Sequence, residues 1–334
     1  MLNIASLPSA AALARLDWKA EVGPQPSKAV VAGDEVYVGT QTPDKRSELH
    51  RFSAASGRRL STAHTWTGTL QGSMGSTAVM KGVDGQLMGV DASSGERKWG
   101  FHAGLRPTAE GYNGEQAVVA TERGLAALSE GGPAGLEVPF SITLPDARCI
   151  SPGPDGWLVL TGRYSGTGQI VSLDSQGQTR WKAPADTGGP RHAPQMGVEG
   201  TVYSTGYNGM LSAFDGKTGE LKWQYETGET YNNRPDVGPA GQVVVSTQRG
   251  HVALLDSEGR ETWKLDTGAQ VLGCFVHPDG TVFVQHPESL EALDALTGST
   301  LQKLPIQPAD LTQAPDGSLY AMSRNGTLQK IVLE

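Results

Sequence analysis

The sequence contains little cysteine, no long apolar run and no excess of positive charge. Only two cysteines, Cys149 and Cys274, occur in 334 residues, which excludes a disulfide scaffold and a site with four thiolate ligands. No segment approaches the roughly 18 consecutive apolar residues of a membrane-spanning helix, so we expect no transmembrane segment. The 35 acidic residues outnumber the 27 basic ones, and this balance does not favour binding to nucleic acid.

Glycine and proline, in contrast, are abundant. The chain has 44 glycines and 20 prolines, more than the average share of about 12%, and this composition disfavours long helices. Hydrophobic residues make up 37% and charged residues 19% of the chain, which is enough apolar material for a sizeable core. The composition therefore indicates a folded protein with many turns.

A repeat of about 40 residues runs along the chain, a period typical of stacked repeat architectures. Short β-rich runs such as EVYVGT, TVYSTGYNG and QVVVSTQRG each end in a polar turn. Eight runs begin at Val36, Ala78, Ala117, Trp157, Val202, Val243, Val282 and Leu319. A second apolar stretch follows each run and closes on a polar turn, as in FDGKTGELKW, which is the chemistry of a hairpin.

Tryptophan recurs at a fixed distance from this turn. The turn glycine is followed four residues later by tryptophan in the pairs Gly95 and Trp99, Gly177 and Trp181, Gly219 and Trp223, and Gly259 and Trp263. Trp66 lies out of register, and the turn in SEGGPAGLEVPF is degenerate. With one more apolar segment beyond each Trp, every unit holds four short strands. We therefore expect an all-β fold, an eight-bladed β-propeller of four-stranded blades.

The two ends of the chain look like complementary parts of one blade. DWKAEVG around Trp18 has the pattern of LKWQYETG around Trp223, whereas the last unit stops at TLQKIVLE without a Trp strand. We therefore expect the N-terminal strand to close the last blade and cover its free edge. This interpretation gives a tail at residues 1–16 and a single propeller domain at residues 17–334. Packing between blades is the expected role of Trp18, Trp99, Trp181, Trp223 and Trp263.

The pattern of an apolar strand, an Asp, a Gly turn and a Trp, as in AFDGKTGELKW and GVDASSGERKW, resembles the tryptophan-docking repeat of pyrroloquinoline quinone (PQQ)-type propellers. It differs from the WD40 repeat, which has Gly-His and Trp-Asp signatures. Quinoprotein dehydrogenases with this repeat hold their cofactor with adjacent cysteines, a stacking Trp and a calcium site. Cys149 and Cys274 are far apart in the chain, so that platform is missing. Size and repeat number are more similar to non-catalytic, BamB-like propellers.

The BamB-like resemblance implies a non-enzymatic protein-interaction scaffold without a cofactor, which binds a protein partner through loops of one face. We expect a monomer. The resemblance also implies the bacterial cell envelope, although the N-terminus shows neither a recognisable signal peptide nor a lipobox cysteine. Two alternatives stay open: a degenerate quinoprotein-type enzyme or small-ligand sensor that uses the central channel, and an exported effector or module of a larger protein.

Catalytic and metal-binding motifs are missing from the sequence. It contains no GxSxG, HExxH, P-loop or EF-hand pattern. The seven histidines never fall at HxH or HxxxH spacing, and we expect no metal site. Cys149 and Cys274 fall on predicted inner strands of different blades, so we expect free thiols rather than a disulfide.

Basic residues recur where the chain enters the innermost strand of a blade. They are Lys28, Arg106, Arg148, Arg191 with His192, and Arg234. At one mouth of the expected channel they would concentrate positive potential, and the guanidinium group suits carboxylate or phosphate. We therefore expect an anion-accepting mouth for an acidic peptide segment or a small anionic ligand, with Tyr231, Asn232 and Asn233 as supporting contacts. The alternative is that these cations pair locally with Asp or Glu on adjoining blades, or are simply solvated at the tips of loops.

Overall fold

The computed structural model describes residues 13–41, 46–65, 68–82, 84–102, 110–112, 115–121, 124–129, 137–142, 147–153, 155–161, 168–185, 192–197, 199–206, 208–231 and 233–333. These residues form strands and turns, and none of them belongs to a helix that could cross a membrane. The strands make eight sheets of four strands each. The all-β, eight-bladed β-propeller expected from the sequence is thereby confirmed, and we number the blades 1 to 8 along the chain.

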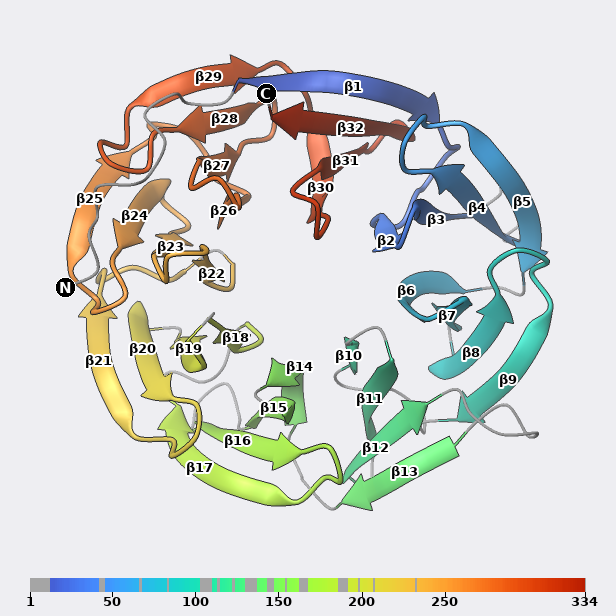
Figure 1. Ribbon diagram of the computed structural model, residues 1–334, viewed down its shortest axis with the longest axis horizontal. Coiled ribbons are helices and arrows are strands. Elements are labelled where there is room, and N and C mark those ends of the chain that lie inside the picture. The colour runs from blue at the N-terminus through green and yellow to red at the C-terminus, as the bar shows by residue number, and fades with distance from the viewer. Residues whose placement is uncertain are drawn as a thin grey trace. The chain divides into compact units, whose positions relative to one another are not determined.

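The chain divides into two compact units. The first unit comprises Arg15–Pro145 and Pro308–Val332, and the second comprises Asp146–Gln307 with the ends of the chain. Blades 8, 1, 2 and 3 belong to the first unit, and blades 4 to 7 belong to the second. Figure 1 labels the strands.

The first unit contains the following strands. Blade 1 consists of β2 (Val30–Ala32), β3 (Glu35–Gln41), β4 (Ser47–Ser53) and β5 (Arg59–Thr65). Blade 2 consists of β6 (Thr69–Met74), β7 (Thr77–Lys81), β8 (Gln86–Asp91) and β9 (Arg97–His102). Blade 3 consists of β10 (Glu110–Tyr112), β11 (Gln116–Thr121), β12 (Gly124–Ser129) and β13 (Glu137–Ile142). Blade 8 consists of β30 (Pro308–Gln313), β31 (Leu319–Ser323), β32 (Thr327–Leu333) and β1 (Ala14–Glu21).

The second unit repeats the same four-stranded pattern. Blade 4 consists of β14 (Ala147–Gly153), β15 (Gly156–Thr161), β16 (Gly168–Asp174) and β17 (Thr179–Ala185). Blade 5 consists of β18 (Gln195–Met196), β19 (Thr201–Thr205), β20 (Met210–Asp215) and β21 (Leu221–Glu226). Blade 6 consists of β22 (Asp236–Val237), β23 (Val243–Ser246), β24 (His251–Leu255) and β25 (Glu261–Asp266). Blade 7 consists of β26 (Gly273–Val276), β27 (Val282–Gln285), β28 (Leu290–Leu293) and β29 (Thr300–Leu304).

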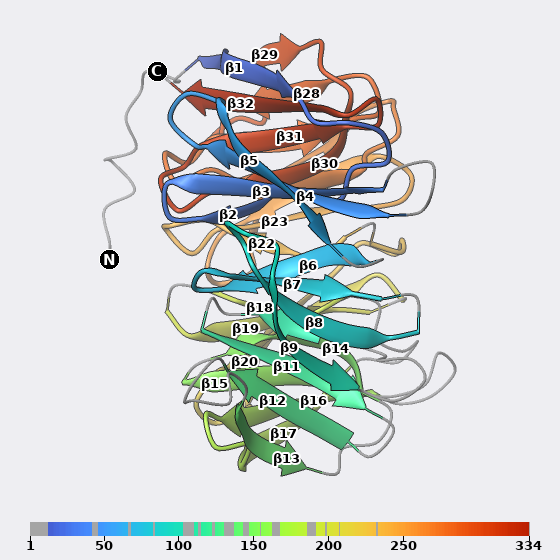
Figure 2. The same ribbon diagram turned by 90° about the vertical axis from the view of Figure 1, so that its right-hand side faces the viewer.

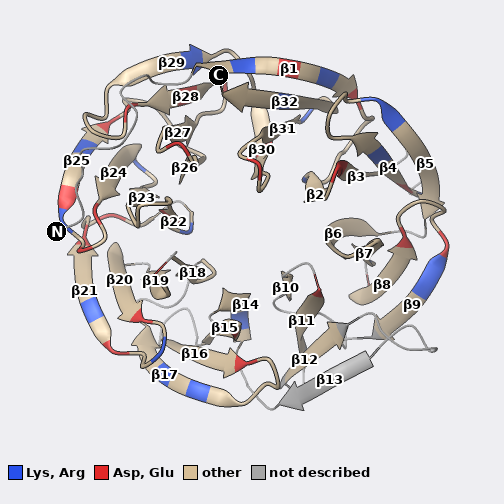
Figure 3. Cartoon of the chain, in the orientation of Figure 1, with Lys and Arg blue, Asp and Glu red and all other residues tan. Residues whose placement is uncertain are grey.

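The central strands carry the core. The strand β23 reads VVVS and all four of its residues are buried, because β-branched side chains fill a strand that is covered on both faces. Its register pairs Val243 with Leu255 of β24. The outermost strand β21 instead alternates exposed and half-buried residues from Trp223 onward, so only one of its faces is covered. Lys and Arg gather along the outer strands, such as β1, β9, β17 and β21, whereas Asp and Glu mark many of the turns (Figure 3).

Tryptophans of the outer strands dock on the turn of the next blade. In the second unit the indole N–H groups of Trp181, Trp223 and Trp263 donate to the carbonyls of Gly216, Ser257 and Ala295 at 2.8, 3.0 and 2.9 Å. A Cβ added to Gly219 would lie 2.7 Å from the Trp181 ring, and Gly219 has a φ of 76°. Only glycine meets both conditions without strain, which explains the fixed Gly in the repeated turn.

The N-terminal strand closes the last blade, as the sequence predicts. The strands lie side by side in the order β1, β32, β31, β30 (Figure 2), and the N–H of Val22 donates to the carbonyl of Gly326 at 2.8 Å. Trp18 of β1 donates from its indole N–H to the carbonyl of Ala54 in blade 1 at 3.1 Å. The outer strand of blade 8 thus uses the same docking contact as the strands of the second unit.

Two features differ from the expected regular pattern. The strand β1 begins at Ala14, earlier than the expected domain start, because Ala14 is buried and its N–H and carbonyl both bond the side-chain amide of Gln302. Trp99 is buried, but its indole nitrogen has no hydrogen-bond partner among the described residues. Trp66 and the degenerate turn at residues 130–136 lie outside the described ranges.

Candidate functional site

Three of the basic residues predicted from the sequence lie at the starts of neighbouring inner strands in the second unit. Arg148 is the second residue of β14, His192 precedes β18 and Arg234 precedes β22. These strands are spatial neighbours, since β14 contacts β18 and β18 contacts β22. Because successive blades share one antiparallel connectivity, the three side chains belong to the same end of the unit. We call Arg148, His192 and Arg234 the inner basic row.

The other predicted site residues lie elsewhere. Lys28 is exposed and precedes β2 in the first unit. Arg106, Arg191 and Asn232 lie outside the described residues. Within the inner basic row Arg234 is exposed, whereas Arg148 and His192 are half-buried and each takes part in polar or electrostatic interactions. Arg234 is therefore the guanidinium group of the row that is most open to a ligand.

Two of the predicted cations have a carboxyl group close by. Burial raises the pKa of Asp236, while a hydrogen bond from the Val276 N–H at 2.8 Å and the charge of Arg234 oppose that rise. In the first unit, burial likewise raises the pKa of Asp310, and the charge of Lys28 opposes it. Local pairing, the alternative that the sequence left open, thus accounts for part of the environment of these cations. The sequence analysis did not single out either carboxyl group.

Two of the predicted supporting residues, Tyr231 and Asn233, make contacts that hold the loop. Tyr231 is fully buried and packs in the same core cluster as Tyr203 and Val243; its burial raises its pKa. The side-chain oxygen of Asn233 accepts a hydrogen bond from Ser246 at 3.1 Å. Both residues anchor the segment between β21 and β22 that carries the exposed Arg234.

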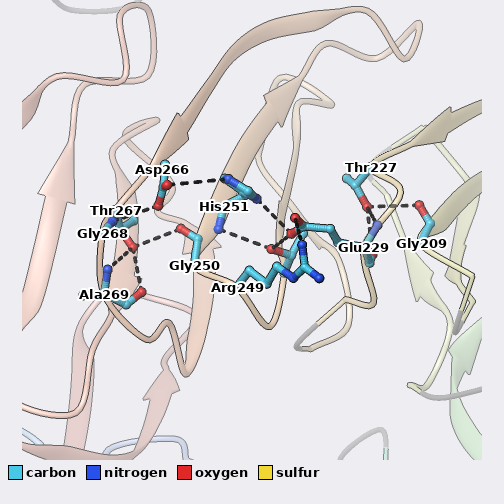
Figure 4. A network of polar contacts seen from close by, with 11 residues as sticks. Gly209, Thr227, Glu229, Arg249, Gly250, His251, Asp266, Thr267, Gly268 and Ala269 are labelled. Carbon is cyan, nitrogen blue, oxygen red and sulfur yellow. Dashed lines mark hydrogen bonds and ion pairs between the residues drawn. The ribbon is translucent and has the colours of Figure 1, made fainter.

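A network of polar contacts joins this same loop to blade 6 (Figure 4). The carboxylate of Glu229 accepts a hydrogen bond from the hydroxyl of Thr247 at 2.7 Å and lies 2.8 Å from Nδ1 of His251. Arg249 lies 3.7 Å from the other carboxylate oxygen, and Nε2 of His251 lies 3.7 Å from Asp266. The hydrogen bonds from His251 and Thr247 lower the pKa of Glu229. We call these five residues the Glu229 clasp.

The clasp was not predicted, although an internal comparison of the repeats contains a signal for it. The Thr-Gly pair after β21 recurs after β25. The Thr227 hydroxyl contacts the carbonyls of Gly209 and Glu229, and the Thr267 hydroxyl contacts those of Gly250 and Ala269, all within 2.9 to 3.2 Å. Glu229 therefore occupies the position of Ala269, and a carboxylate where the next repeat has a methyl group is the distinguishing feature.

The two thiols are buried or half-buried, and burial disfavours their reactive thiolate form. Cys149 and Cys274 are free, and burial raises their pKa values to about 11 and about 12. A thiol with a raised pKa is a poor nucleophile at neutral pH. Within the described ranges, no group of three or more His, Cys, Asp and Glu residues could hold a metal ion.

Comparison with known proteins places the repeat in a defined group. The family model described as outer membrane protein assembly factor BamB matches residues 6–138, 145–240 and 231–327. A serine/threonine-protein kinase, AfsK of Streptomyces coelicolor, is 35% identical over 123 residues, which cover 32% of this chain and 15% of the kinase. The outer membrane protein assembly factor BamB of Burkholderia pseudomallei is 28% identical over 109 residues, covering 32% of this chain and 28% of that protein.

A solved structure shows the same fold with a distant sequence. The C-terminal WD40 domain of Sif2 matches with a TM-score of 0.72 at 11% identity, covering 97% of this chain and 99% of that chain. At this identity the likeness concerns the fold alone. The matches to the curated relatives span between 15% and 35% of those proteins' lengths.

Proposed function

The chain belongs to the family of the outer membrane protein assembly factor BamB, and from this premise we propose that it is a non-enzymatic scaffold that binds a protein partner through one face of its blades. The partner segment that we propose is acidic. A small anionic ligand could bind the same cationic groups as an acidic peptide segment. The proposal includes Arg106, Arg191 and Asn232 on the basis of their sequence positions alone.

The observation that carries this proposal is the inner basic row. Its members come from three neighbouring blades at equivalent points of the repeat, so one extended segment could contact them in succession. A guanidinium group can donate two parallel hydrogen bonds to a carboxylate. Because Arg234 is exposed but close to Asp236, an incoming carboxylate would compete with an existing partner, and we expect reversible rather than very tight binding.

The rest of the fold supports a scaffold. Trp181, Trp223 and Trp263 each connect one blade to the next through a hydrogen bond of 3.0 Å or less. Such repeated contacts hold the loops of successive blades in fixed positions. A preorganised surface loses less conformational entropy when a partner binds.

The proposal is tested with a fluorescein-labelled oligoglutamate peptide and fluorescence anisotropy at low salt. We expect Arg148→Ala combined with Arg234→Ala to raise the Kd about tenfold, since two such charge contacts of roughly 0.7 kcal/mol each amount to about 1.4 kcal/mol. Arg234→Lys, which keeps the charge near Asp236, is expected to retain part of the affinity. Melting temperatures of all variants show whether the blades remain folded.

The matched control is Lys217→Ala combined with Arg260→Ala. This control also removes two positive charges. Lys217 lies in the turn before β21 and Arg260 in the turn before β25, and neither belongs to the inner basic row. An equal loss of affinity in this control would indicate nonspecific charge attraction. Unchanged affinity in the inner-row variant would contradict the proposal, and displacement of the peptide by inorganic phosphate at similar concentration would assign the site to small anions instead.

A further inference from the structure

Glu229 is a carboxylate located in the loop that presents an anion-binding arginine. We propose that Glu229 is a positioning residue: its clasp on blade 6 fixes the segment from Thr227 to Pro235 so that Arg234 is held in its binding position. This inference rests on the proposed function. Glu229 carries the same negative charge as the ligand that we propose. Its contacts with blade 6 would therefore increase affinity indirectly, without touching the ligand.

The clasp joins two blades of the second unit. Glu229 belongs to the connection from blade 5 to blade 6. Thr247 and Arg249 belong to the turn between β23 and β24, and His251 is the first residue of β24. The Thr247 hydroxyl, 2.7 Å from the carboxylate, is buried with its residue, and the backbone N–H of His251 in turn donates to that hydroxyl at 3.2 Å. The carboxylate is thus held by partners that are themselves fixed.

The backbone of the loop follows the same path. The N–H of Gln248 donates to the carbonyl of Thr230 at 3.0 Å, and Tyr231 forms an antiparallel bridge with Thr247. The side chain of Asn233 then accepts a hydrogen bond from Ser246. Thr230, Tyr231 and Asn233 therefore lie along β23 and the turn that follows it, and Arg234 comes directly after Asn233.

The backbone of Glu229 passes close to Gly209, as the backbone of Ala269 passes close to Gly250 in the next repeat. A Cβ on Gly209 would lie 2.5 Å from the carbonyl oxygen of Glu229 and 2.6 Å from its nitrogen. No side chain fits at this position. The Glu229 backbone can therefore pack against the turn between β19 and β20 only because residue 209 is glycine. The loop thus contacts blade 5 through the backbone of Glu229 and blade 6 through the carboxylate of Glu229.

Positioning and simple electrostatics predict opposite effects of removing this charge. If Glu229 were only a negative group near an anion site, Glu229→Ala would tighten binding of an acidic peptide, because a repulsive charge is lost. If Glu229 positions the loop, the same variant weakens binding. The sign of the change in Kd therefore distinguishes the two roles.

The experiment measures oligoglutamate affinity by anisotropy for the wild type, Glu229→Ala, Glu229→Gln and Glu226→Gln. We expect Glu229→Ala to raise the Kd about fivefold, within the usual range of coupling between sites. Glu229→Gln retains an acceptor for Thr247 and is expected to recover part of the affinity. Glu226→Gln removes an equal charge from the exposed end of β21, outside the clasp, and is expected to leave the Kd unchanged or lower it slightly.

Two further readouts separate positioning from loss of stability and from loss of a ligand contact. The dependence of log Kd on log salt concentration should keep its slope in Glu229→Ala, because no ligand contact is removed, whereas Arg234→Ala should reduce it. Hydrogen exchange of the amides from residue 230 to residue 234 should accelerate in Glu229→Ala without a large fall in melting temperature.

Tighter or unchanged binding by Glu229→Ala would overturn the inference, and so would unchanged hydrogen exchange in the loop. If the wild type fails to bind the peptide at all, the proposed function fails, and the binding role of Glu229 fails with it. Faster exchange in the variant would then still show that the clasp orders the loop, which keeps the two failures distinguishable.

Discussion

At the scale of the single residue, the docking of Trp181 depends on the absence of a side chain at Gly219. The glycine combines a positive φ with direct contact to the indole ring. Gly268 in blade 6 also has a positive φ, 63°, but a Cβ there would meet nothing within 4 Å. Substitution of Gly268 by alanine therefore causes backbone strain alone, whereas the same substitution at Gly219 causes backbone strain and a steric clash with Trp181.

We predict that Gly219→Ala destabilises the protein more than Gly268→Ala. Both substitutions place Ala in a left-handed conformation, at a cost of about 1 kcal/mol, and only Gly219→Ala also pushes the Trp181 ring away, which adds about 1–3 kcal/mol. Urea unfolding followed by tryptophan fluorescence measures both values. Equal losses in the two variants would mean that the indole contact contributes nothing to stability.

At the scale of the element, the repeated turn is held by an aspartate. The carboxylate of Asp215 accepts backbone hydrogen bonds from Lys217 and Thr218, both at 2.9 Å, and these bonds, that from Thr218 first, lower its pKa. Asp91 and Asp294 cap their turns in the same way. The acidic residues of the turns thus have a structural role that the sequence pattern of Asp and Gly already indicated.

The lowered pKa of Asp215 gives a pH dependence of stability with a definite sign. Because its folded pKa lies below the unfolded value of about 3.9, its contribution is complete above that pH and is lost as the pH falls through the folded pKa. Asp215→Asn keeps an acceptor but loses the charge, so we predict a loss on the order of 1 kcal/mol at neutral pH that shrinks on acidification.

Thermal unfolding of both proteins between about pH 2 and pH 7 measures this difference. The control is Asp34→Asn, since the Asp34 side chain accepts no turn hydrogen bond among the described residues. A gap between wild type and Asp215→Asn that stays constant down to the lowest pH would show that the charge is not what stabilises the turn.

The elements also show which parts of the structure the sequence could predict. The strands, the turn glycines and the closure of the last blade by the Trp18 strand could be predicted from the sequence repeat. Each blade buries its sheet with the same pattern of residues, so the pattern recurs along the chain. The Glu229 clasp does not repeat, since Ala269 takes its place in the next loop. Contacts that occur once, between residues of adjacent repeats, leave no periodic signal. Asp236 was missed for a different reason, because the pairing alternative considered carboxylates on adjoining blades, whereas Asp236 is two residues from Arg234 in the chain.

At the scale of the whole molecule, fold and function are separate questions. The likeness to a WD40 domain at 11% identity shows how widely this fold is shared, and a shared fold does not define an activity. Family membership is consistent with the binding function that we propose. The proposed scaffold then depends on one surface of the second unit, where the sequence predicted basic residues and the structure adds the loop that carries Arg234.

The most direct test of the scaffold account is affinity capture from an extract of the source cells, quantified by mass spectrometry for three baits. These are the wild type, Arg148→Ala with Arg234→Ala, and the control Lys217→Ala with Arg260→Ala. The account predicts a protein with an acidic segment that is enriched by the wild type and the control and lost with the inner-row variant. Equal enrichment by all three baits, or enrichment of nothing by the wild type, would contradict it.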